Sequence, residues 1–169
     1  KQPINAYGET KLTIERALPH LERAYGLKWM ALRYFNAAGA HPDGTIGEDH
    51  AVELHLIPLA IQAATGGKPL KVFGEDYPTP DGTCQRDYIH VCDLAEAHLC
   101  ALRALENGAP SAAYNIGTGA PQSVRAVIDA VSRVVGKPVA WEAAPRRPGD
   151  PAMLYASSEL AQRELQWTP

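Results

Sequence analysis

Residues 5–36 read NAYGETKLTIERALPHLERAYGLKWMALRYFN, and this stretch decides the expected fold. Asn5 stands where a helix cap is needed, apolar residues recur at helical spacing after it, and Gly26 ends the pattern. Pro19 lies inside the pattern and is expected to kink the helix or divide it in two. The apolar run 29–35 is typical of a buried parallel strand. A helix followed by a buried strand predicts an α/β fold.

The rest of the chain continues this alternation. Further helices are expected in the segments ELHLIPLAIQAA, LAEAHLCALRALE (capped by Asp93), VRAVIDAVSRVV (capped by Ser123) and SSELAQREL. Strands are expected in LKVF, RDYIHV, AAYNI and VAWEAA. No internal repeat and no linker composition interrupts these elements, so we expect residues 1–169 to belong to a single domain.

Composition excludes several classes of function. The 169 residues are 46% hydrophobic and 21% charged, which is enough to bury a core and too polar for a membrane protein. The formal net charge of -3, without any basic run, argues against a nucleic-acid partner. No stretch has the length and apolar character of a membrane span or a signal peptide. We therefore expect a soluble, cytoplasmic protein.

The spacing of cysteines and histidines argues against a metal centre. Cys84, Cys92 and Cys100 are odd in number and eight residues apart, which fits neither a disulfide framework nor a CxxC metal site. They are expected to be reduced thiols. None of the six histidines lies three or four residues from another histidine or a cysteine, so no metal site is predicted.

The sequence does not begin as a dinucleotide-binding domain begins. Such a domain starts with a strand and a glycine-rich turn that opens a helix. This sequence starts with a loop before a helix, and its glycine pair GTG at residues 117–119 follows a late strand. We interpret residues 117–119 as a tight turn and not as a dinucleotide fingerprint.

Tyr7 and Lys11 form a Y-x-x-x-K pair, which a helix places on one face, one turn apart. A neighbouring ammonium stabilises a phenolate, and a phenolate can take a proton from a substrate hydroxyl during hydride transfer. The alternative is a surface pair in which the lysine stem packs on the ring.

Three further positions are candidates for binding. Asn36 follows the carboxyl end of a predicted parallel strand, where ligands bind in α/β sheets, or else serves only as a turn residue. Arg86 and Arg147 are well-separated arginines beside turns, which suits a diphosphate, although each alone is more often a solvated loop charge. Phe73 can stack on a base, with a core position as the equal alternative.

In combination, the motifs resemble the UDP-glucose 4-epimerases (UDP-galactose 4-epimerases) of the extended short-chain dehydrogenase/reductase superfamily. The resemblance rests on NAYGETK, LRYFNAAGAHPDGTIGED, HLIPLAIQAA, KVFGEDYPTPDGTCQRDYIHVCDLAEAH, YNIGTG and APRRPGDP, in that order. It implies the C-terminal part of an extended Rossmann-type fold of the NAD-dependent epimerase/dehydratase kind. That part comprises the substrate-binding region with the last helices and strands of the parallel sheet. The chain is thus expected to be the C-terminal half only, a partial domain without the N-terminal NAD-binding half.

The same resemblance implies roles for individual residues. Tyr7 would be the catalytic base, Lys11 would stabilise its phenolate and hold the nicotinamide ribose of NAD, and Phe35 would line the nicotinamide side. The residues implied to bind the UDP-hexose are Asn36, His55, Leu56, Lys71, Val72, Phe73, Arg86, Arg147, Asp150 and Leu154.

Within that set, Lys71–Phe73 would frame the uracil, Arg86 and Arg147 would hold the diphosphate, and Asp150 would contact the uridine ribose. His55 departs from the asparagine that is common at its position in the family. Leu154 falls where family members gate the 2-substituent of the sugar, and its intermediate size implies that N-acetylhexosamines are accepted.

The implied activity is the interconversion of UDP-glucose and UDP-galactose by transient NAD-dependent oxidation at C4, carried out by a homodimer. Two alternatives stay open: another nucleotide-sugar enzyme of this superfamily, such as a dehydratase, and a non-catalytic truncated fragment that retains part of a UDP-sugar site. The isolated chain is expected to be inactive. Its unpaired sheet edge favours association with another chain.

Overall fold

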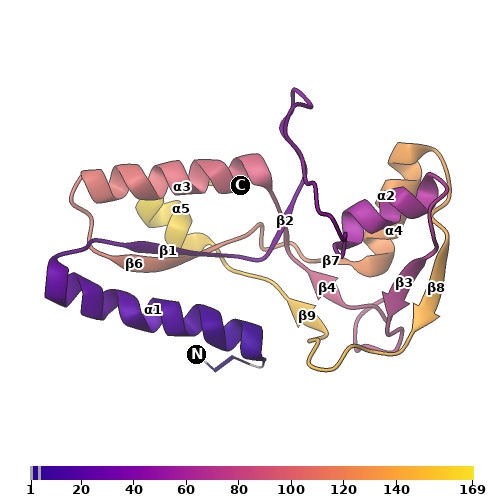
Figure 1. The fold of residues 1–169 in the computed structure, drawn as a ribbon, viewed down its shortest axis with the longest axis horizontal. Coiled ribbons are helices and arrows are strands. Elements are labelled where there is room, and N and C mark those ends of the chain that lie inside the picture. Colours follow the sequence, from indigo (N-terminus) through magenta and orange to yellow (C-terminus); the bar gives the residue numbers. More distant parts are fainter. Residues whose placement is uncertain (1, 4) are drawn as a thin grey trace.

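Short strand pairs, most of them parallel, are flanked by helices in this chain (Figure 1). The structure is a computed structural model that describes residues 2–3 and 5–169. Its elements in order are α1 (Ala6–Tyr25), β1 (Met30–Tyr34), β2 (Asn36–Ala38), α2 (Leu56–Ala64), β3 (Leu70–Phe73), β4 (Gln85–Arg86), β5 (Tyr88–His90), α3 (Val91–Glu106), β6 (Ala112–Ile116), β7 (Gln122–Ser123), α4 (Val124–Val135), β8 (Trp141–Ala144), β9 (Met153–Leu154) and α5 (Glu159–Leu165).

The first helix begins and ends where the sequence predicts. The side chain of Asn5 accepts a hydrogen bond from the backbone N–H of Gly8 at 2.8 Å, which satisfies one of the free donors of the first turn. Gly26 ends α1 in the left-handed conformation, with φ 70°. Division of the helix at Pro19 is wrong, because α1 continues through that residue. Proline removes one backbone hydrogen bond, and the turns on both sides keep theirs.

The strand pairing confirms the predicted α/β class. β1 pairs in parallel with β6, β2 with β5, and β3 with β8. β4 lies between β7, which is antiparallel to it, and β9, which is parallel. The sequence pattern missed β2, β7 and β9, since two or three residues are too few to show an alternation. The expected strand RDYIHV is divided into β4 and β5 by Asp87.

Two hydrophobic clusters hold the elements together, one at each end of the molecule (Figure 1). The first packs α2 and α4 onto β3 and consists of Ala60, Ala63, Ala64, Leu70, Val72, Val127, Ile128, Val131 and Val139. The second packs α3 and α5 onto β5 and β6 and consists of Ile89, Ala97, Ala101, Tyr114, Ile116, Ala161, Leu165 and Trp167. The strands β4 and β9 run between the two clusters (Figure 1).

The predicted N-caps of α4 and α3 have different outcomes. Ser123 caps α4 as predicted, since its side chain accepts from the N–H of Ala126 at 3.0 Å. Asp93 does not cap α3. The helix begins at Val91, two residues earlier, and its cap is His90, whose Nδ1 accepts from the N–H of Cys92 at 3.2 Å. Pairing of β5 with β2 continues the strand up to His90 and thereby decides where the helix begins.

α1 is the least buried helix. None of its described residues is buried, and Ile14 and Tyr25 are 60% and 80% exposed. A salt bridge between Glu15 and Arg33 ties the helix to β1. Across the part of the chain that the structure describes, no helix combines the length and apolar character that crossing a bilayer requires. The three cysteines are free thiols, as predicted.

The carboxylate of Asp87 joins segments that are far apart in the sequence. The residue is completely buried. Its Oδ1 accepts from the N–H and the hydroxyl of Thr118 at 3.0 and 2.6 Å, and its Oδ2 accepts from the N–H groups of Gly119 at 3.0 Å and Ala156 at 3.3 Å. A side chain at Gly117 would meet this carboxylate, because a Cβ there would lie 2.6 Å from Oδ2. The turn at 117–119, interpreted from sequence as a tight turn, thus packs against the buried carboxylate of Asp87 and donates its N–H groups to it.

We expect Asp87→Asn to lower the free energy of unfolding by about 2–3 kcal/mol, because an amide turns an N–H₂ donor toward groups that are themselves donors. Urea unfolding followed by circular dichroism measures the loss. Asp129→Asn, an exposed position on α4, serves as the matched control and should change stability by less than about 0.5 kcal/mol. Equal stability of the Asp87 variant and the wild type would contradict the assigned role.

Candidate active site

A cavity of about 1640 Å³ opens between the two hydrophobic clusters. Its wall is built from α1, the junction of β1 and β2, the loop of residues 39–55, α2, β3, β4 and the segment 147–150. Most of the site residues proposed from sequence line it, namely Tyr7, Phe35, Asn36, His55, Leu56, Lys71, Phe73, Arg86, Arg147 and Asp150. Side chains from seven elements or segments are therefore gathered around one space.

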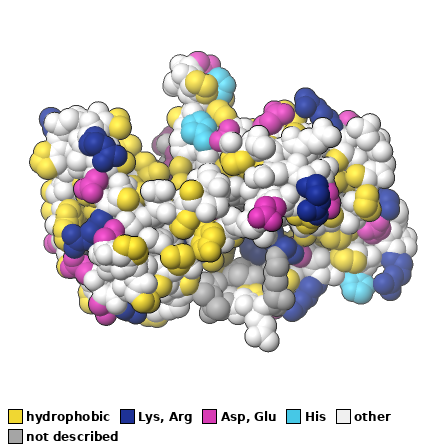
Figure 2. Space-filling view, turned by 180° about the vertical axis from the view of Figure 1, so that it is seen from behind, with side chains coloured by type: hydrophobic (Ala, Val, Ile, Leu, Met, Phe, Trp, Pro, Cys, Tyr) yellow, Lys and Arg dark blue, Asp and Glu magenta, His cyan; other side chains and the backbone are white. Residues whose placement is uncertain are grey.

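The 39–55 loop protrudes from the body of the molecule between β2 and α2 (Figure 1). Seen from behind in Figure 2, the protrusion stands above the surrounding surface and carries histidine and acidic side chains. Several of its residues, among them Gly39, Ile46 and His50, line the cavity. The loop thus forms one rim of the site.

Tyr7 and Lys11 are brought together as their spacing predicts. The ammonium of Lys11 lies 5.1 Å from the centroid of the Tyr7 ring, over its face. The Tyr7 side chain is 72% exposed and lies at the cavity, whereas Lys11 is not part of the cavity wall. Tyr7 therefore lies at the cavity, with the Lys11 ammonium against its ring.

Arg86 is held in place by protein groups on three sides. Its Nη1 donates to the carbonyl oxygens of Gln85 at 2.7 Å and Pro151 at 2.9 Å, and its Nη2 lies 2.5 Å from Oδ1 of Asp150. Its side chain is only 12% exposed. The implied roles give the diphosphate to Arg86 and the ribose to Asp150, but in this structure the two residues form an ion pair with each other. The pair fixes the guanidinium at the cavity wall.

The neighbouring arginines Arg146 and Arg147 point to different partners. The Arg147 guanidinium lies 3.9 Å from the centroid of the Phe73 ring, and both residues line the cavity. Arg146 instead lies over the ring of Tyr77 and donates from Nε to Asp76 at 2.7 Å. That hydrogen bond holds the pKa of Asp76 below its usual range. Only Arg147 of this pair is available to a ligand in the cavity.

Two implied binding residues lie outside the cavity wall. Val72 is 1% exposed and belongs to the first hydrophobic cluster, because the alternation of β3 turns its side chain away from Lys71 and Phe73. Of that trio only Lys71 and Phe73 line the cavity. Leu154 lies on β9, paired with Arg86, and is 43% exposed without being part of the wall.

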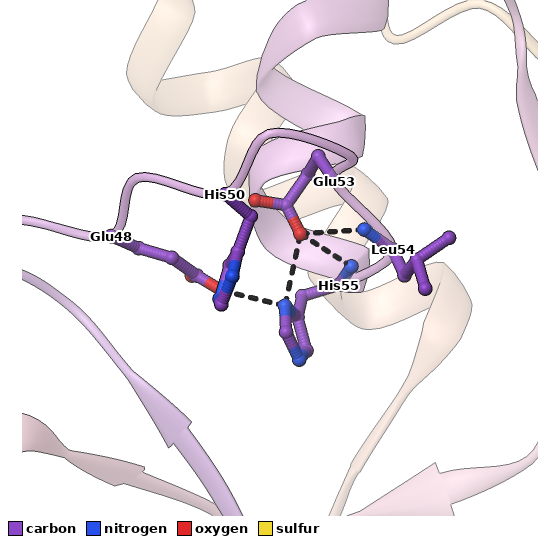
Figure 3. A network of polar contacts seen from close by, with 5 residues as sticks. All are labelled: Glu48, His50, Glu53, Leu54 and His55. Atoms are coloured by element: carbon purple, nitrogen blue, oxygen red, sulfur yellow. Dashed lines mark hydrogen bonds and ion pairs between the residues drawn. The ribbon is translucent and has the colours of Figure 1, made fainter.

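The loop before α2 contains a polar network that the sequence did not reveal (Figure 3). Nδ1 of His55 lies 2.6 Å from Oε1 of Glu48 and 2.9 Å from Oε1 of Glu53. Nε2 of His50 lies 3.1 Å from the same Glu48 oxygen. Glu53 also accepts the N–H groups of His55 and Leu54 at 2.7 Å each, and its backbone bond with His55 lowers the pKa of Glu53. His55 is the N-cap residue of α2.

Sequence reasoning also missed Tyr88 and Cys84, which line the cavity from the inner side. Burial raises the pKa of Tyr88 to about 12 and also raises the pKa of Cys84. Both lie within the stretch 71–98 that carries the family resemblance, but the resemblance implied no role for either. Their placement follows from the pairing of β4 and β5 with strands that come much earlier or later in the chain.

The model of the NAD dependent epimerase/dehydratase family matches residues 1–117. The chain belongs to this family. Among its relatives, the UDP-glucose 4-epimerase of Halalkalibacterium halodurans is 53% identical over 168 residues, which are 99% of this chain and 50% of that protein. The UDP-glucose 4-epimerase of Corynebacterium glutamicum is 53% identical over 169 residues, with the same coverage of both chains.

Solved structures show the same fold. The UDP-glucose 4-epimerase of Brucella ovis in complex with NAD superposes with a TM-score of 0.94 at 49% identity, over 99% of this chain and 52% of that one. The enzyme of Bifidobacterium longum in complex with NAD⁺ and UDP gives 0.90 at 41% identity, over 97% and 50%. This family member thus has an α/β Rossmann-type epimerase fold and spans about half the length of the relatives it matches.

One prediction is corrected by these comparisons. Assignment of the chain to the C-terminal half only does not stand, because the family match falls on residues 1–117, the N-terminal part. What the comparisons establish is membership of the family and a length about half that of its relatives.

The raised pKa of Tyr88 predicts a loss of stability in alkali. An unfolded tyrosine ionises near pH 10, whereas folded Tyr88 keeps its proton to about pH 12. The contribution of neutral Tyr88 is therefore fully present below pH 10 and is lost as the pH rises through 12. Between pH 10 and 11 the free energy of unfolding of the wild type should fall about 1 kcal/mol more than that of Tyr88→Phe.

Urea unfolding at fixed pH values from 8 to 11 measures this difference. Tyr25→Phe removes an exposed phenol and is the control, which should follow the wild type. Parallel curves for the wild type and Tyr88→Phe would contradict the prediction.

Proposed function

We propose that this chain contributes the proton-transfer pair and the UDP-sugar site of a UDP-glucose 4-epimerase, which interconverts UDP-glucose and UDP-galactose. One observation carries the proposal: the phenol of Tyr7 and the guanidinium groups of Arg86 and Arg147 line the same cavity. The phenol can exchange a proton with a sugar hydroxyl, and the two guanidinium groups suit a diphosphate. Because the chain spans about half the length of its relatives, the activity belongs to the complete enzyme.

Tyr7 takes the proton from the 4-hydroxyl of the sugar and later returns it. The Lys11 ammonium lies over the ring, 5.1 Å from its centroid, and so places a positive charge beside the proton-transfer residue. The exposure of Tyr7 toward the cavity leaves its oxygen accessible to the substrate. Proton removal is needed at the moment when C4 gives up its hydride, so the base must lie beside C4.

NAD, when bound, supplies the reversible acceptance of that hydride. The residues of this chain fit the nicotinamide end of the cofactor. Lys11 offers an ammonium to the nicotinamide ribose, beside the ring of Tyr7, and Phe35 offers an apolar wall at the cavity. The structures of the relatives from Brucella ovis and Bifidobacterium longum hold NAD or NAD⁺, which supports the assignment.

The nucleotide is anchored while the sugar is left free to turn. Arg86 is already oriented by two carbonyl groups and Asp150, so it binds a diphosphate without losing conformational freedom. Arg147 leaves the face of Phe73 to reach the diphosphate, and the ring it uncovers can then stack on the uracil. A 4-keto sugar held mainly through its diphosphate can rotate and present its other face to the hydride.

The finer assignments are part of the same proposal. Asn36 and His55 lie at the cavity and contact the nucleotide sugar together with Leu56, Lys71 and Phe73. Val72 contributes to the uracil site only by positioning its two neighbours on β3. The complete enzyme is a cytoplasmic homodimer, and the exposed apolar side chains of α1 and the three free thiols are consistent with that.

Tyr7→Phe is expected to reduce turnover of UDP-galactose by the complete enzyme more than about 10³-fold, since phenylalanine cannot exchange a proton. Binding of UDP, measured by calorimetry, should persist because the arginines are untouched. Tyr25→Phe, on the same helix but outside the cavity wall, is the control and should keep normal turnover. Retained turnover in Tyr7→Phe would refute the base assignment.

Acceptance of N-acetyl sugars is proposed from the size of Leu154. The complete enzyme should turn over UDP-N-acetylgalactosamine as well as UDP-galactose. Leu154→Tyr should lower the ratio of kcat/KM for the N-acetyl sugar to that for UDP-galactose by about tenfold or more, the scale of one lost steric fit. Complete rejection of UDP-N-acetylgalactosamine by the wild type, or an unchanged ratio in the variant, would remove this part of the proposal.

A further inference from the structure

The 39–55 loop brings together two imidazoles and a carboxylate from residues that are not neighbours in the sequence. Glu48, His50 and His55 each offer one ligand atom, and these three atoms all lie within 4.8 Å of one another. We propose that they form a binding site for a divalent transition-metal ion of the zinc class. The three side chains belong to one loop that ends at α2, so the ion would be held at the rim of the cavity.

The geometry is close to what such an ion requires. Ligand atoms of a tetrahedral zinc site lie about 2.0–2.2 Å from the metal and therefore roughly 3.3 Å from one another. In this structure Oε1 of Glu48 is 3.1 Å from Nε2 of His50 and 2.6 Å from Nδ1 of His55. The two imidazole rings are 5.1 Å apart at their centroids and inclined by 41°. Small side-chain rotations on an exposed loop are enough to point all three atoms at one centre.

The donor set selects the type of ion. Two imidazoles and one carboxylate suit zinc and its neighbours in the first transition row, whereas calcium and magnesium prefer oxygen ligands alone. Three protein ligands leave a fourth position open, as in zinc sites that bind water or an exogenous ligand. The sequence predicted no metal site because no histidine lies three or four residues from another histidine or a cysteine. That spacing applies to ligands on one face of a helix, whereas residues 48–55 form a loop that precedes α2.

Glu53 positions the cluster without being one of its ligands. It accepts the backbone N–H groups of Leu54 and His55 at 2.7 Å each, which fixes the turn that leads into α2 (Figure 3). Its side chain is 12% exposed, against 28% for Glu48. His55 makes no side-chain capping bond to the helix, so a metal bound by its imidazole would leave the start of α2 intact, with the ion replacing the contact of Nδ1 with Glu53 at 2.9 Å.

The alternative is a pair of histidine–carboxylate contacts that share Glu48 and bind no metal. Both arrangements need negative charge beside the imidazoles, but only a metal requires both rings at once. His41 provides the matched comparison. It lies in the same loop, and its Nδ1 is 2.7 Å from Oδ1 of Asp43, but among the described residues no second imidazole completes a cluster around it.

Zinc titration of the 169-residue chain by isothermal calorimetry tests the proposal. We expect one saturable site, and we expect His50→Ala, His55→Ala and Glu48→Gln each to weaken its affinity by at least about tenfold, since even residues that only support a ligand contribute that much. His41→Ala should bind with the wild-type affinity. All four positions are exposed, and circular dichroism checks that the variants keep the wild-type fold.

Cobalt binding provides a second measurement, because the three cysteines are alternative ligands for zinc. Co²⁺ in the proposed site should give visible absorption without a thiolate charge-transfer band. His50→Cys, unlike His50→Ala, should still bind the ion and should add that band. The proposal is overturned if the chain binds no zinc, if the His50 and His55 variants keep the wild-type affinity, or if His41→Ala loses as much. Because binding is read directly, the result is independent of whether the proposed epimerase activity is correct.

Discussion

The buried carboxylate of Asp87 is the constraint on which the rest of the structure depends. Its side chain accepts from Thr118, Gly119 and Ala156, while its backbone accepts from Asn36 and donates to Leu154. Chain segments from four parts of the sequence therefore meet at one residue. A buried carboxylate is tolerated only where hydrogen bonds replace its lost hydration, and here those bonds also join segments that are far apart in the sequence. Asp87 follows Arg86 directly, so the same residue fixes a wall of the cavity.

The cavity combines rigid and movable cations. Arg86 is held by carbonyl groups and by Asp150, whereas Arg147 rests on an aromatic face, a contact that a phosphate can outcompete because it offers full negative charge. Such an arrangement favours a ligand that is held by the arginines through a negatively charged group. In the proposed function, these cations hold the diphosphate while the sugar faces Tyr7 and the 39–55 loop, so the sugar is free to rotate.

The 39–55 loop forms a rim of the cavity that carries imidazole and carboxylate side chains. Its backbone leaves β2 and returns only at α2, so nothing in a regular helix or strand decides where its side chains point (Figure 1). At its end before α2, Glu53 fixes the backbone through the N–H groups of Leu54 and His55 that it accepts. The result is a cluster of imidazoles and carboxylates at the rim of a cavity whose wall carries Arg86 and Arg147. Charges of both kinds thus flank the cavity, with arginines on the inner wall and the acidic loop outside.

The sequence by itself determined the features that depend on neighbours along the chain. The α/β class, the extent of α1 from Asn5 to Gly26, the cap at Ser123 and the approach of Lys11 to Tyr7 all follow from helical periodicity and capping, which act over three or four residues. Only the tertiary structure decided the ion pair of Arg86 with Asp150, the burial of Val72, the start of α3 at Val91 and the meeting of His50 with His55. These depend on strand pairing and loop paths that join residues far apart or irregularly spaced, and no local pattern encodes such distances.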